Sequence, residues 1–201
     1  MHATTKEERI GWRHEVRLGW GDQLFESLIW HNPTNIVSAM PESFTRTYAE
    51  NYHHNQHLWA EYHYHPNYWF SVGLTIDISE VNWTDVTRNG KGAVIGTDPG
   101  HYFANIVVMP TIRFTYLHHP YVNLYSGLGI GAGFNTGTEV NPKGQHTDVG
   151  YAVDLRVIGL SVTYKRFAFN IDAGGLYSVK DMNTIFMVSS KIISASIGVS
   201  F

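Results

Sequence analysis

The stretch that decides the fold is Ile193-Ser194-Ala195-Ser196-Ile197-Gly198-Val199-Ser200-Phe201. Apolar residues occupy every second position, and small residues fill the positions between them. Successive side chains of a strand point to opposite faces of the sheet. The pattern therefore predicts a strand with one apolar face and one small polar face.

Seven further segments alternate in the same way. They lie at about 12–20, 58–64, 70–79, 102–116, 122–134, 151–164 and 167–173. A change of phase in the sixth segment predicts a bulge near Val157 to Gly159. No run approaches the roughly 18 consecutive apolar residues that a membrane helix needs. The expected fold is all-β, an eight-stranded antiparallel up-and-down barrel.

The connections predict where this barrel lies. Four links are long, at about 21–56, 80–100, 135–150 and 178–188, and the three links between them are only a few residues. Transmembrane barrels combine long extracellular loops with short periplasmic turns. Aromatic residues make up 14% of the chain, and threading the strands up and down gathers them near both ends. Two such belts are typical of residues at the two membrane interfaces. A soluble barrel with inward apolar faces is the alternative.

With these features the chain resembles the small eight-stranded outer-membrane barrels of the OmpA/OmpX-like superfamily, whose last strand also closes on a phenylalanine. Its loop segments Trp30-His31-Asn32-Pro33 and Met40-Pro41-Glu42-Ser43 resemble those of members from Bacteroidetes. The resemblance implies a barrel domain over residues 11–201, a periplasmic segment over 1–10, and a location in the outer membrane. Residues 1–9 lack the apolar core of a signal peptide, so we expect the signal peptide to have been removed.

The face assigned to the lumen carries five acids and three bases. An eight-stranded barrel is just wide enough for side chains to fill, and an unpaired buried charge is strongly destabilising. We therefore expect an ion-pair network rather than an open pore, although a paired-carboxylate acid/base site is the sharper alternative. The predicted members are Glu15, Arg17, Glu61, Asp77, Arg113, Asp154, Arg156 and Asp172.

The first long link is the candidate interaction loop. Asp22 can cap a helix that ends at Asn32-Pro33, and a second short helix is expected after Pro41. The apolar content argues against disorder and leaves three placements open: over the barrel mouth, in the membrane interface, or against a neighbouring protein. The candidate contact residues are Leu24, Phe25, Leu28, Ile29, Phe44, Tyr48 and Tyr52.

Metal, cofactor and catalytic motifs are weak. The histidines at 53, 54, 57, 63 and 65 are dense, but the first three lie in or beside the first long link and the last two share a strand face, too far away for all to converge as zinc ligands do. We therefore expect no metal site and no cofactor. The His-x-Ser pair of lipid A deacylases and the Asp-Ser of palmitoyl-transferring barrels do not occur.

The function expected from the sequence is structural or binding. We expect an accessory subunit of a larger outer-membrane complex, acting through its loops and lipid-facing wall. Its partners would be lipid or lipopolysaccharide and other outer-membrane proteins, with no nucleic acid, since the net charge is -3. The alternatives are a free-standing adhesin, a lipid A-modifying enzyme, and a narrow channel that the small lumen disfavours.

Overall fold

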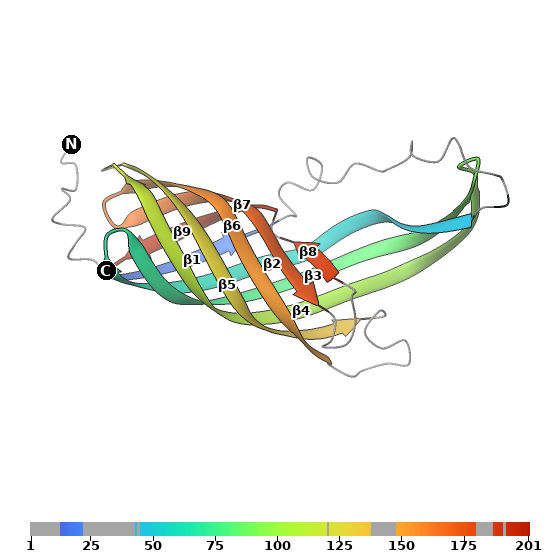
Figure 1. Cartoon of the computed structure of the whole chain (residues 1–201), viewed down its shortest axis with the longest axis horizontal. Coiled ribbons are helices and arrows are strands. Elements are labelled where there is room, and N and C mark those ends of the chain that lie inside the picture. Colours follow the sequence, from blue (N-terminus) through green and yellow to red (C-terminus); the bar gives the residue numbers. More distant parts are fainter. Residues whose placement is uncertain are drawn as a thin grey trace.

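The computed structural model describes residues 13–21, 43, 45–119, 121–137, 148–179, 187–190 and 192–201. All nine strands lie in one antiparallel sheet, which a pairing between β6 and β7 closes into a barrel (Figure 1). The strands are β1 (His14–Trp20), β2 (Thr45–Asn67), β3 (Phe70–Asn89), β4 (Val94–His118), β5 (Val122–Gly137), β6 (Asp148–Tyr164), β7 (Phe167–Val179), β8 (Met187–Ser190) and β9 (Ile193–Ser200).

The barrel has eight strands around its wall, because β8 and β9 are two pieces of one strand. Both pair with β7 in the same continuous register, and residues 191–192 interrupt them. The last strand closes the wall against β1, where the backbones of His14 and Phe201 exchange two hydrogen bonds of 3.1 and 2.9 Å. The predicted fold is thus confirmed. In the described part of the chain, no helix is long and apolar enough to cross a membrane.

The wall has its apolar side chains outside and its polar side chains inside. On β3, Leu74, Ile76 and Ile78 are exposed, whereas Thr75 and Asp77 between them are fully buried. This arrangement is the reverse of a soluble protein and is typical of a barrel whose outer wall faces lipid. The soluble alternative, with apolar faces inward, does not agree with it.

Aromatic side chains on the outer wall lie near both ends of the barrel. Trp20, Tyr102, Phe134 and Tyr151 are exposed toward the long-link end. At the other end the exposed rings are Phe114, Tyr116, Tyr164, Phe167 and Phe201. Aliphatic residues occupy the wall between these two groups, as they do between the aromatic girdles of membrane barrels.

Three strands are much longer than the sequence pattern indicated. The predicted loop at 80–100 is wrong in large part, because β3 runs to Asn89 and β4 begins at Val94. The predicted loop at 21–56 is wrong from Thr45 onward, where β2 begins. β1 ends opposite Leu58 and β5 ends opposite Phe103, so β2, β3 and β4 continue past the rim as a three-stranded sheet (Figure 1). We call this sheet, residues 45–56, 80–89 and 94–102, the extension. It is about a dozen residues long, or roughly 40 Å.

The turn at the tip of the extension is built by one asparagine. The Asn89 carboxamide oxygen accepts hydrogen bonds from the backbone N–H groups of Lys91 (3.1 Å) and Ala93 (2.9 Å). Gly92 has a φ of 83°, which favours glycine. An Asn-Gly pair between two runs of strand-forming residues is a hairpin signal, and it was present in the sequence at Asn89-Gly90.

The other connections follow the expected alternation. β2 and β3, β4 and β5, and β6 and β7 are joined by short turns, whereas residues 138–147 and 180–186 form longer links. The register shift at Arg156/Ile158 confirms the predicted bulge in β6.

The first-loop prediction divides into two parts. Tyr48 and Tyr52 belong to β2, so their assignment to a loop is wrong. The short helix expected after Pro41 can lie only before Thr45, where β2 begins. Residues 22–42, with Leu24, Phe25, Leu28 and Ile29, lie outside the described residues, as do Phe44 and the segment 1–10.

Candidate functional site

All eight residues predicted for the lumen lie on the inward face of the wall. Each has at most 6% of its surface exposed. They come from six different strands, β1, β2, β3, β4, β6 and β7, and the barrel closure brings them together. Seven of the eight belong to two hydrogen-bonded clusters, and Asp77 pairs separately with a histidine.

The first cluster lies toward the short-turn end and is centred on Glu15. Arg17 donates from Nε to Glu15 Oε1 at 2.7 Å, and Arg113 donates from Nη2 to Glu15 Oε2. His65 Nε2 also contacts Glu15 Oε2, at 3.1 Å. Since one carboxylate holds two guanidinium groups, we describe this as the Glu15 cluster.

Tyr125 joins the Glu15 cluster to Asp172. Arg17 Nη1 donates to the Tyr125 hydroxyl at 2.7 Å, and that hydroxyl donates in turn to Asp172 Oδ1. The guanidinium carbons of Arg17 and Arg113 lie 4.9 and 5.1 Å from the centre of the Tyr125 ring. The buried ring therefore contacts both cations, as well as the anion that its hydroxyl binds.

The second cluster is centred on Arg156. Its Nη1 donates to Glu61 Oε2 at 3.0 Å, and Nη2 donates to Glu61 Oε1 and to Asp154 Oδ2, the latter at 3.1 Å. Thr75 donates a further hydrogen bond of 3.2 Å to Glu61. Both oxygens of Glu61 are thus engaged, which favours a structural role over acid/base chemistry.

Asp77 pairs with a histidine rather than with an arginine. His57 Nε2 lies 3.2 Å from Asp77 Oδ2, and both side chains are fully buried. Sequence reasoning did not place His57, His63 or Tyr125 in the network. The signal was their position: His57, His63 and His65 share the odd-numbered inward face of β2 with Glu61, and Tyr125 shares that of β5 with the inward glycines.

The lumen also contains an apolar cluster. Val107, Met109, Ala152 and Leu176 form a fully buried cluster there, which the sequence analysis did not anticipate. The β5 glycines make room for it, since a Cβ at Gly131 would lie 2.5 Å from Met109 Cβ. Polar and apolar layers together fill the interior.

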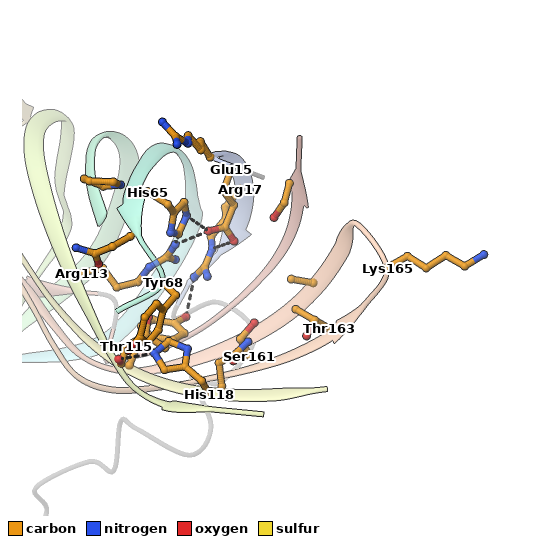
Figure 2. A pocket seen from close by; sticks show the side chains of 17 residues that line it. Glu15, Arg17, His65, Tyr68, Arg113, Thr115, His118, Ser161, Thr163 and Lys165 are labelled. Atoms are coloured by element: carbon orange, nitrogen blue, oxygen red, sulfur yellow. Dashed lines mark hydrogen bonds and ion pairs between the residues drawn. The ribbon is translucent and has the colours of Figure 1, made fainter. Parts of the chain in front are cut away.

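A cavity remains at the short-turn mouth, with a volume of about 270 Å³. Figure 2 shows Glu15, Arg17, His65 and Arg113 on one side of it and Thr115, His118, Ser161 and Thr163 on the other. Tyr68 lies edge-on to His118, with ring centres 5.0 Å apart. We call this cavity the mouth pocket.

The described residues form no cluster of metal ligands. No group of three or more His, Asp or Glu side chains among them could hold a metal ion. The His63 and His65 rings lie side by side, with centres 6.5 Å apart, but each contacts a different glutamate, Glu61 and Glu15.

Comparison with known proteins gave matches among solved structures alone. The sequence matches no protein family profile, and no curated protein is significantly similar to it. Among solved structures, Ail, the attachment invasion locus protein of Yersinia pestis, is similar with a TM-score of 0.47 and 16% identity. The match covers 94% of this chain and 99% of Ail, which was solved in complex with the heparin analogue sucrose octasulfate. The strand pairings described above establish the barrel independently of this similarity.

Proposed function

We propose that this protein is an integral outer-membrane barrel that works as a binding subunit, docking another outer-membrane protein through the extension. The observation that carries the proposal is the three-stranded sheet that rises beyond the rim. A barrel that only anchored itself in lipid would not need these additional strand residues.

The exposed aliphatic wall supports the membrane location. In the described residues, β1 to β7 and β9 pair into a closed ring, so the backbone groups within that ring are bonded to neighbouring strands rather than exposed to lipid. The filled interior supports a role other than transport, because charged and apolar side chains occupy the lumen from the Glu15 cluster to Leu176. In this proposal the protein acts by binding and is not an enzyme.

The edges and tip of the extension support docking. Among the described residues, none pairs with the outer edge of β2 from Thr45 to Gln56 or with that of β4 from Val94 to Gly100. Val94 and Ile95, near the tip, are 50% and 54% exposed. A free strand edge offers alternating N–H and C=O groups to an extended segment of another protein, and exposed apolar residues add contact area.

A pull-down from native outer membranes in mild detergent tests this proposal. The test variant replaces residues 85–98 by Asn-Gly, which shortens the β3–β4 hairpin but leaves the barrel register unchanged. The matched control replaces residues 138–147 by a Gly-Ser segment of equal length. We expect a stoichiometric protein partner with the native chain and the control, and none with the shortened hairpin. Retention of the partner by the shortened hairpin would contradict the proposal.

Two other functions have distinct signatures. A free-standing adhesin would purify without a protein partner and bind a surface ligand through the same extension. A lipid A-modifying enzyme would shift the mass of lipid A when the protein is expressed, and an unchanged lipid A mass supports the binding role.

A further inference from the structure

The mouth pocket has a surplus of positive charge. Three guanidinium groups line it, those of Arg13, Arg17 and Arg113, and Glu15 is the one carboxylate among the described residues that line it. Glu15 is already engaged by Arg17, Arg113 and His65. No acid of the lining therefore remains to balance Arg13.

Arg13 is well placed to act at the entrance. It precedes β1 and is exposed, and its backbone is fixed by the hydrogen bond of 2.8 Å from His65 N–H to its carbonyl. Arg113 adds a further unsatisfied donor, because its Nη1 is buried without an acceptor. The cluster thus holds more donors than acceptors.

Lys165 also borders the mouth pocket, but its ammonium group does not point into it. Figure 2 shows its side chain extended away from the pocket, and its ammonium group lies 5.5 Å from the centre of the Tyr164 ring. It carries the same charge as Arg13 but points elsewhere, so it provides a natural control.

The wall opposite the guanidinium groups is lined by three residues that carry hydroxyl groups, Thr115, Ser161 and Thr163. Hydroxyl and guanidinium groups together are the donors that phosphate and carboxylate oxygens accept from. The volume of about 270 Å³ exceeds that of several water molecules, at roughly 30 Å³ each, and suits a small molecule rather than a folded domain.

We propose that the mouth pocket binds a small oxyanion, a phosphate or carboxylate group, that enters from the short-turn side. Arg13 closes on the anion at the entrance, and Arg17 and Arg113 supply the fixed positive field behind it. The site is independent of the docking role of the extension, which lies at the opposite end of the barrel.

The test is isothermal titration calorimetry of the folded barrel in nanodiscs of zwitterionic phospholipid at low salt. Inorganic phosphate and citrate are the soluble probes, and a second set of discs carries an anionic phospholipid. We expect saturable binding of a soluble probe that weakens about tenfold in Arg13→Gln, the loss of one charge-assisted contact. Lys165→Gln should change the affinity less than twofold.

The two disc sets distinguish the sources of the oxyanion. Loss of probe binding only in the anionic discs would identify a lipid headgroup as the occupant, and unchanged binding would identify a soluble ligand. If neither phosphate nor citrate binds in the zwitterionic discs, the proposal is wrong. Equal weakening by Arg13→Gln and Lys165→Gln would also overturn it, because that result indicates a diffuse surface charge.

Discussion

Arg156 shows how a single residue stabilises the interior of this barrel. It is buried between Glu61 and Asp154, and its guanidinium carbon lies 5.2 Å from the centre of the Trp59 ring. Removing it leaves two carboxylates in the lumen without their cation. A buried ion left without its partner is far more destabilising than the loss of an exposed pair.

We therefore expect Arg156→Met to lower the free energy of unfolding by about 3 to 5 kcal/mol. Urea-induced unfolding of the barrel in lipid bilayers measures this change. Arg13→Met, which removes an exposed arginine, should change the value by less than about 0.5 kcal/mol. The double variant Glu61→Gln/Arg156→Met should recover part of the loss. Equal stability of the Arg156 and Arg13 variants would show that the network does not stabilise the fold.

Gly19 shows how closely the side chains inside the barrel are packed. A Cβ built on it would lie 2.2 Å from the Trp59 ring, whereas a Cβ on Gly96, in the extension, meets nothing nearer than Thr87 Cβ at 3.8 Å. Gly19→Ala should destabilise the barrel by about 1 to 3 kcal/mol through overpacking, measured by the same unfolding experiment. Gly96→Ala is the control and should have little effect. A neutral Gly19→Ala would mean that the ring of Trp59 can move aside.

The extension is the element that most distinguishes this protein from a minimal barrel. Its strands lack the lumen contacts and the closed pairing that stabilise the wall. Local unfolding of the extension should therefore need less free energy than local unfolding of the barrel wall.

Hydrogen–deuterium exchange measures this difference directly. Amides of β3 from Thr84 to Asn89 should exchange much faster than those from Ser71 to Ser79 of the same strand. When the docking partner is present, the extension amides should become protected. Equal protection of both halves in the isolated protein would indicate that the extension is as stable as the wall.

The sequence predicted the barrel elements well and the extension poorly, for a physical reason. Wall strands face lipid on one side and a polar lumen on the other, so their residues must alternate, as Leu74 to Ile78 do. Extension strands bury a few apolar side chains, those of Val81, Trp83 and Val86, but they do not alternate strictly, and their many polar residues resemble a loop. Inward positions such as Glu15 and Arg156 followed from the alternation. The contact between Tyr125 and Asp172 depends on barrel closure, which no local pattern contains.

The whole molecule is a barrel with an aliphatic outer band, a filled lumen, a sheet rising from one end and a basic mouth at the other. The two ends are separated by the packed interior, from the Glu15 cluster to the apolar layer around Met109. The docking role and the oxyanion site both depend on this arrangement, in which lipid surrounds the wall.

The most direct test uses the absence of cysteine from the sequence. Single variants Ile76→Cys on the outer wall, Thr97→Cys in the extension and Ser196→Cys in the lumen are folded into bilayers. Each is tested for reaction with a membrane-impermeant maleimide. A fluorophore coupled at residue 76 before folding is then tested for quenching by lipids brominated on their acyl chains. We predict rapid reaction only at residue 97, and strong lipid quenching at residue 76. Rapid maleimide reaction at residue 76 without lipid quenching would contradict the membrane-spanning barrel.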